Sequence, residues 1–161
     1  VSDINAFATY DGSVRVFAGL MDLMTDDEIL GVIGHEIGHV KLGHTKKAYK
    51  QALLTSALAD YGGSTNGTLS TLSNSQVGEI ATQLTSAQFS QGQESGSDEY
   101  AYKFMVALGK DPAALASAFN KLGSLSDGKA STAQKLMSSH PDSAKRAKKV
   151  EEKIAKDAKK K

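Results

Sequence analysis

The chain has 161 residues, a net charge of +1 and an apolar content of 40%. This length and composition suit one folded domain with its own core, and they exclude the disordered and fibrous classes of protein. The absence of cysteine excludes a disulfide framework, a thiolate metal site and a cysteine nucleophile. No apolar run approaches the roughly 18 residues that span a bilayer, and no signal-peptide pattern opens the chain. Because the sequence opens at Val1 in mid-pattern, we expect a trimmed domain.

Positive charge is concentrated at the C-terminal end of the chain. Residues 141–161 carry nine Lys and Arg against four Asp and Glu, whereas residues 1–140 carry ten against fourteen. A basic tail can contact nucleic acid or anionic lipid, but a solvated helix end explains the same composition. We expect residues 150–161 to form a basic helical tail, and we expect no nucleic-acid partner.

A β-hairpin is predicted near the N-terminus. Residues 7–10 and 14–17 are rich in β-prone side chains, and Asp11-Gly12-Ser13 separates them. An Asp-Gly turn between two such runs is a strong hairpin signal.

A long helix is predicted to follow, beginning at about residue 26. Thr25 precedes three acidic residues, and Glu28 stands three positions after it, which is the pattern of a capping box with an acidic first turn. We expect the helix to continue to at least residue 44, with an extension as far as Leu58 left open.

Two stripes along this helix predict how it packs. One is apolar and is expected to be the core face; it consists of Ile29, Ile33, Ile37 and Val40. The other is bare and consists of Gly31, Gly34 and Gly38. Each interior glycine costs about 0.5–1 kcal/mol relative to alanine, so three on one face indicate that another backbone packs very close to the helix.

The rest of the chain is predicted to form helices joined by short loops. Residues 62–76 are rich in Gly, Ser, Thr and Asn and are expected to form a flexible loop. Beyond it, helices are predicted over about 77–87, 91–108 and 112–123, and again after Pro141. The sequence therefore predicts one α+β domain over residues 1–161, mainly α-helical, with a small hairpin at its front.

The strongest functional signal is His35-Glu36-Ile37-Gly38-His39, an H-E-x-x-H sequence inside the predicted helix. Successive helical residues turn by about 100°, which places His35 and His39 about 40° apart and about 6 Å along the axis. Two imidazoles so placed can bind one tetrahedral zinc ion. Glu36 lies on the same side, where it can act as general base on a zinc-bound water without being a ligand.

A catalytic zinc ion needs a third protein ligand and an open fourth position. His44 lies about 140° around the helix from His39 and points the wrong way unless the helix breaks at Gly43. The positions that a metzincin fills with Gly and His hold Leu42 and Thr45, which excludes that subclass.

Two candidates for the third ligand lie later in the chain. His140 precedes a proline in a predicted loop. Glu94 and Asp98 are four residues apart on one predicted helix and therefore share a face. We favour Glu94 as the ligand, with Asp98 accepting a hydrogen bond from the free N–H of a ligand histidine and so fixing its tautomer.

In these features the chain resembles the HtpX-like gluzincin metallopeptidases. This group includes bacterial envelope quality-control proteases, Oma-type mitochondrial proteases and CAAX prenyl proteases, and the likeness is greatest to bacterial periplasmic lipoprotein members. The motifs that carry the likeness span residues 3–150. They are Asn5-Ala6-Phe7-Ala8, Gly19-Leu20-Met21, the H-E-x-x-H helix, Glu94 with Asp98, and His140-Pro141 followed by Arg146.

The resemblance implies a zincin-like (minigluzincin) fold in which the hairpin packs on the zinc-binding helix. It implies one zinc ion per chain, held by His35, His39 and Glu94. His140 and Arg146 fall on the late His-Pro and Arg motif of the family. There, one of the two is open to a role in the transition state or, Arg146 above all, in orienting a metal ligand. An ion pair that locks the last helix against the zinc helix is equally open.

The expected function is a zinc metalloendopeptidase that hydrolyses peptide bonds in unfolded or damaged envelope proteins. The strand at 14–17 is expected to align the substrate by pairing with it. The family implies a bacterial periplasmic location and an N-terminal membrane or lipid anchor outside this chain. Two alternatives are a non-catalytic, zinc-stapled module that binds misfolded clients and a nucleic-acid or membrane-surface module acting through residues 145–161.

Overall fold

The computed structural model describes residues 3–63, 88–125 and 133–160. The elements of this part are, in chain order, β1 (Ala6–Ala8), β2 (Val14–Val16), α1 (Ala18–Leu23), α2 (Asp26–Lys41), α3 (His44–Gly63), α5 (Gln91–Ala107), α6 (Ala113–Ser124), α7 (Gln134–Ser139) and α8 (Ser143–Ala158). Helices dominate, and β1 and β2 form an antiparallel pair. The predicted class, mainly helical α+β, is therefore confirmed.

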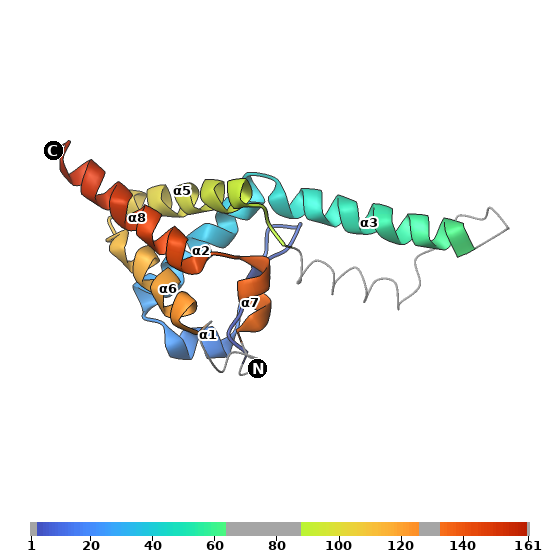
Figure 1. The fold of residues 1–161 in the computed structure, drawn as a ribbon, viewed down its shortest axis with the longest axis horizontal. Coiled ribbons are helices and arrows are strands. Elements are labelled where there is room, and N and C mark those ends of the chain that lie inside the picture. The colour runs from blue at the N-terminus through green and yellow to red at the C-terminus, as the bar shows by residue number, and fades with distance from the viewer. Residues whose placement is uncertain (1–2, 64–87, 126–132, 161) are drawn as a thin grey trace.

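The helices pack around α2. Figure 1 shows α5 and α6 against α2, α8 lying across α6, and α3 extending away from this body. The buried apolar core lies between α2, α5, α6 and α8, and α1 contributes Leu20 to it. Within the described ranges, no helix has the combination of length and hydropathy needed to cross a membrane.

The predicted β-hairpin is present, with a shorter first strand. Ala8 pairs with Val14, and Gly12 adopts a φ of 90° in the turn, a conformation that glycine tolerates. Tyr10 was expected in the strand but lies in the turn, where its ring stacks on that of Tyr49 with 4.0 Å between centroids. This contact fastens the tip of the hairpin to the first turns of α3.

Helix α2 begins where the capping box predicts but ends earlier than expected. The Thr25 hydroxyl accepts from the Glu28 N–H, and the Glu28 carboxylate accepts from the Thr25 N–H. The helix ends at Lys41 because Gly43 takes a φ of 75° and its N–H closes the last turn onto a helix carbonyl. The expected continuation to residue 44 is wrong, since a separate helix starts at His44.

The glycine stripe of α2 contacts two other helices, as predicted. A Cβ atom at Gly38 would lie 3.0 Å from the Cα of Ser97 in α5, and one at Gly31 would lie 3.2 Å from the Cα of Leu115 in α6. The expected core face is correct only at Ile29, which packs half-buried against the core. Ile33, Ile37 and Val40 are also only half-buried, and none of them belongs to the core cluster. The close approach of α5 and α6 buries the bare stripe and the His-Glu side of α2 instead.

The later predicted helices agree with α5, α6 and α8, whereas α1 and α7 were not predicted. Helix α8 starts at Ser143, so the expected basic tail from residue 150 is the second half of a longer helix. One face of the first half is buried. Gly62 and Gly63, expected in a loop, belong to α3. The rest of that loop, 64–76, and the predicted helix over 77–87 lie outside the described residues.

Candidate metal centre

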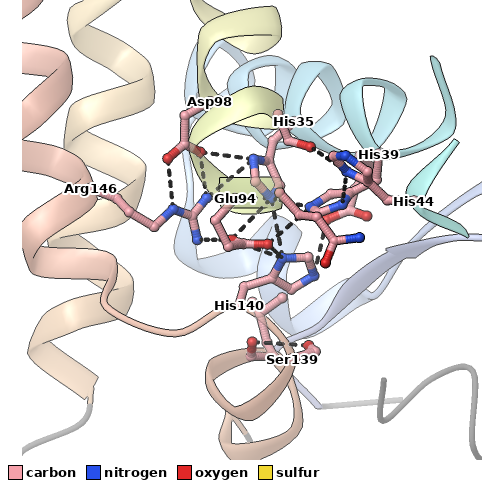
Figure 2. A network of polar contacts seen from close by, with 12 residues as sticks. His35, His39, His44, Glu94, Asp98, Ser139, His140 and Arg146 are labelled. Atoms are coloured by element: carbon pink, nitrogen blue, oxygen red, sulfur yellow. Dashed lines mark hydrogen bonds and ion pairs between the residues drawn. The ribbon is translucent and has the colours of Figure 1, made fainter. Parts of the chain in front are cut away.

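Four buried side chains from separate parts of the chain converge on one point. They are His35, His39, Glu94 and His140, and one potential ligand atom from each lies within 4.8 Å of the other three. The His39 Nε2 atom lies 3.0 Å from His35 Nε2 and 3.0 Å from Glu94 Oε1. The His140 Nδ1 atom lies 3.1 Å from Glu94 Oε1. Figure 2 shows the three imidazole rings and the Glu94 carboxylate pointing toward one another.

The position of Glu94 follows from the start of α5 and from its packing on α2. A capping box between Ser90 and Gln93 fixes the first turn of α5, and Glu94 lies in that turn. One turn later, the backbone at Ser97 contacts Gly38 of α2. Because the two helices meet there without intervening side chains, the Glu94 carboxylate reaches the histidines of α2.

Asp98 lies where the sequence predicts, next to a candidate ligand histidine. Its Oδ1 atom is 2.9 Å from His35 Nδ1, on the ring edge opposite the cluster. The carboxylate accepts, so in this contact the Nδ1 atom carries the hydrogen and the Nε2 atom presents a lone pair. The Nη2 atom of Arg146 also lies near this ring, 3.1 Å from Nδ1 and 3.3 Å from Nε2. The contact with Asp98 favours the tautomer that a zinc ligand needs.

Arg146 holds the two buried carboxylates of α5, Glu94 and Asp98, at once. Its Nε and Nη2 atoms donate to Asp98 over 2.9 and 2.6 Å, and its Nη1 atom lies 2.6 Å from Glu94 Oε2. The guanidinium also lies 4.1 Å above the ring centroid of Phe119. Arg146 is 5% exposed, so these contacts form in a low-dielectric interior where charge-assisted hydrogen bonds are strong.

The protonation states of the cluster suit metal binding. Burial and the charge of Arg146 hold the pKa of His35 well below its ordinary value, and burial lowers the pKa of His39 to about 4. Burial by itself raises the pKa of Glu94, but hydrogen bonds from His140 and His39 outweigh it and hold that pKa well below the ordinary value. Neutral imidazoles and an ionised carboxylate are the forms that bind a metal ion.

Glu36 is buried beside the cluster, with 2% exposure. Its carboxylate accepts from the backbone N–H of Ala8, and burial raises its pKa to about 7. The Nε2 atom of His140 lies 3.5 Å from Glu36 Oε1. Burial alone lowers the pKa of His140, but the carboxylates of Glu36 and Glu94 raise it above its ordinary value.

The donor set fits zinc. Zinc takes imidazole nitrogen and carboxylate oxygen in tetrahedral sites, and two histidines with one glutamate form a known catalytic set. The lone pair on His35 Nε2 faces the ionised Glu94 carboxylate over 3.5 Å. Two acceptors held face to face in a buried site are stabilised by a cation placed between them.

Three contacts of the site were not predicted. His44 lies beside His39, with 3.1 Å between their Nδ1 atoms, because the chain breaks at Gly43. Phe89 packs on the His39 ring with 3.9 Å between centroids. The third is the hydrogen bond from the Ala8 N–H to Glu36. Gly43 is the sequence signal for the contact between His44 and His39. The sequence holds no signal for the contacts of Phe89 and Ala8.

An H-E-x-x-H helix completed by a carboxylate from a later helix is the arrangement of a metallopeptidase of the zincin type. The model of peptidase family M48 matches residues 1–154, and the chain belongs to this family. Zinc is the cofactor of the family.

The chain is similar to two proteases of Escherichia coli (strain K12). It is 44% identical to Metalloprotease LoiP over 155 residues, which are 96% of this chain and 60% of that protein. It is 40% identical to Metalloprotease YcaL over 154 residues, 96% of this chain and 59% of that protein. A Protease HtpX homolog of Salinibacter ruber is 30% identical over 129 residues, 73% of this chain and 45% of that protein.

The chain thus spans about three-fifths of the length of the two Escherichia coli relatives. No solved structure gives a significant match to it.

Proposed function

We propose that the chain is the single catalytic domain of a zinc metalloendopeptidase that cleaves unfolded polypeptides. The observation that carries this proposal is the convergence of two imidazoles and the Glu94 carboxylate next to Glu36, all buried. Membership of a peptidase family supports the same reaction class.

We propose that His35, His39 and Glu94 are the metal ligands. Zinc, when bound there, polarises the scissile carbonyl and makes water more acidic. Asp98 orients the His35 ring by accepting from the Nδ1 atom of His35. Arg146 fixes the positions of the Asp98 and Glu94 carboxylates relative to each other. The two residues are therefore positioning groups in this proposal, because their contacts run to the proposed ligands.

Glu36 is the proposed general base. It takes a proton from the attacking water and passes it to the amine that leaves, as a carboxylate at the edge of such a site can do. The hydrogen bond from the Ala8 N–H restrains the Glu36 carboxylate. The carboxylate is therefore already oriented when proton transfer begins.

His140 is proposed to act on the substrate carbonyl. A catalytic zinc ion keeps one position open, so only three of the four converging donors are needed as ligands. The His140 ring lies between Glu94 and Glu36, where it can donate to the oxygen that gains charge in the transition state. A His140→Phe variant should keep one zinc ion per chain and lose about 100- to 1,000-fold in kcat. Loss of bound zinc would instead make His140 a ligand.

Substrate alignment is proposed at β1, which replaces the expectation for residues 14–17. The Ala8 N–H reaches Glu36, so β1 is the strand beside the general base. The Thr9 N–H donates to the Ser13 carbonyl and the Phe17 N–H to the Asn5 carbonyl. Alternation along an antiparallel pair then turns the polar groups of residues 6 and 8 away from β2. An extended, unfolded segment can pair with the polar groups of this edge other than the Ala8 N–H, which donates to Glu36.

We propose a bacterial envelope location with a membrane anchor outside residues 1–161. The resemblance to periplasmic lipoprotein members of the family supports this placement. Envelope proteins that have lost their fold would supply the extended segments that a strand edge accepts.

The decisive experiment compares Glu36→Gln with the wild-type chain on casein, an unstructured substrate. The variant should bind one zinc ion and lose at least about 100-fold in cleavage rate, because general-base catalysis contributes 10²–10⁴-fold. Glu152→Gln, the same change at an exposed position of α8, is the matched control and should cleave normally. Wild-type activity in Glu36→Gln would refute the assignment. An inert wild-type chain that binds zinc and prevents client aggregation would establish the zinc-stapled module instead.

A further inference from the structure

The break at Gly43 places a third histidine against the metal centre. On a continuous helix, His44 would lie about 140° around the axis from His39. Because α2 ends at Lys41 and the chain turns at Gly43, α3 starts in a new direction. The His44 ring then meets the His39 ring edge to face, with 5.1 Å between centroids.

The contact involves the ring nitrogen of His39 that faces away from the cluster. The Nε2 atom of His39 faces His35 and Glu94, at 3.0 Å from each, whereas its Nδ1 atom lies 3.1 Å from His44 Nδ1. His44 is therefore outside the four converging donors. Figure 2 shows it beyond His39, on the opposite side of the cluster from Asp98 and Arg146.

The two candidate ligand histidines share one feature of their surroundings. In each, the Nε2 atom points into the cluster and the Nδ1 atom meets a side chain outside it. Asp98 accepts at this place for His35, at 2.9 Å, and the Nη2 atom of Arg146 lies 3.1 Å from the same Nδ1 atom. His44 takes the corresponding place for His39.

Small residues on α5 make room for this arrangement. A Cβ atom at Gly96 would lie 3.1 Å from the Cδ1 atom of Leu42 and 4.0 Å from the Cε1 atom of His44. Ser97 follows, with its Oγ atom 3.4 Å from His44 Nδ1. A larger residue at position 96 would press on the turn that carries His44.

We propose that His44 is a positioning residue that accepts the Nδ1 hydrogen of His39 and so holds His39 in the tautomer that binds zinc. A ligand imidazole uses one nitrogen for the metal and carries its hydrogen on the other, and the partner of that hydrogen sets tautomer and ring angle. With Nε2 on the metal, His39 donates from Nδ1. His44 then accepts at Nδ1 and carries its own hydrogen on Nε2. This inference rests on the proposed metal site.

The first experiment measures zinc affinity by competition with a chromophoric chelator. His44→Phe keeps a ring but loses the acceptor, and it should weaken zinc binding about 10- to 100-fold, the usual effect of removing such a partner. His44→Gln offers an amide oxygen to the same hydrogen and should recover most of the loss. Lys46→Ala, at an exposed neighbouring position, is the control and should bind zinc as the wild type does. The metal-free forms of the three variants should have the same melting temperature.

The second experiment needs no variant, so it decides the matter even if His44→Phe fails to fold. Nitrogen-15 NMR of the zinc-loaded chain should find hydrogen on Nδ1 of His39 and on Nε2 of His44. Hydrogen on Nδ1 of His44, or unchanged zinc affinity in a folded His44→Phe, would overturn the inference and leave the proposed peptidase intact. A wild-type chain that binds no zinc would overturn both.

Discussion

At the scale of single residues, the guanidinium of Arg146 is the group on which most others in the site depend. Its three nitrogens reach two buried carboxylates that repel each other in its absence. Arg146→Lys replaces a planar fork by a point charge that cannot make all three contacts. We expect the free energy of unfolding of the metal-free chain to fall by about 2–4 kcal/mol, since breaking a buried pair is costly. Urea unfolding with a chelator present measures it.

The neighbouring Lys145 supplies the control for this substitution. Its side chain is 76% exposed, so Lys145→Ala should change stability by less than about 0.5 kcal/mol. Equal losses in the two variants would contradict the positioning role of Arg146.

The sequence predicted part of the site because some of its geometry is local. The H-E-x-x-H spacing and the four-residue spacing of Glu94 and Asp98 fix directions within one helix, and the structure brings these residues together. Their roles as ligands and base stay predictions. The direction of His44 depends on whether the helix breaks. That is decided by the backbone conformation at Gly43, which sequence spacing alone does not determine.

At the scale of elements, the distance between α2 and α5 controls where Glu94 lies. Gly38→Ala would add a methyl group 3.0 Å from the Cα and 3.1 Å from the carbonyl oxygen of Ser97, which only helix separation can relieve. We expect a loss of about 1–3 kcal/mol in stability, typical of overpacking, together with weaker zinc binding. Thermal unfolding and chelator competition measure the two effects.

Gly92 provides the opposite case on α5. A Cβ atom there would have its nearest neighbour 3.9 Å away, at Ser90 Oγ. Gly92→Ala should therefore stabilise the chain by about 0.5–1 kcal/mol through helix propensity and leave zinc affinity unchanged. A gain of stability in Gly38→Ala as well would show that the contact with α5 is not tight.

The first turn of α2 carries a pH-dependent contribution to stability. Burial raises the pKa of Glu28, but hydrogen bonds from Lys121, Ser117 and the Thr25 N–H outweigh it and lower that pKa from 4.5 to about 2. A carboxylate with a depressed folded pKa stabilises the fold above its unfolded pKa, and this is lost as pH falls from about 4.5 towards 2. The contribution is about 2–3 kcal/mol.

Urea unfolding of the metal-free Glu28→Gln variant between pH 7 and pH 2.5 tests this contribution. The variant should be less stable than the wild type at pH 7, and the difference should shrink as the pH falls through 4.5. Glu152→Gln should follow the wild-type curve throughout. A difference that stays constant with pH would show that ionised Glu28 is not the cause.

Helices with strong end signals were predicted, and short ones without them were not. The capping pattern at Thr25 and the proline before α6 mark helix starts through local interactions, which do not depend on the rest of the fold. Helices α1 and α7 have six residues each, and neither has a side-chain hydrogen bond at its N-cap. Tertiary packing of Leu20 and Leu136 into the core stabilises them, which no local pattern encodes.

At the scale of the whole molecule, the metal site joins the helices that build the core. Removing zinc with a chelator should therefore lower the melting temperature, and one equivalent of zinc should restore it. At a free zinc concentration 1,000 times the dissociation constant, binding contributes about 4 kcal/mol. Scanning calorimetry measures the shift, which Glu36→Gln should retain and His39→Ala should lose. An equal shift in His39→Ala would place the metal elsewhere.

The order of the converging residues along the chain has a consequence for biosynthesis. The helix with His35 and His39 leaves the ribosome long before Glu94, and residues 140 and 146 come last. A growing chain therefore lacks His140 and Arg146 beside the other converging groups until α8 has packed. On the roles proposed above, hydrolysis would wait for that step of folding.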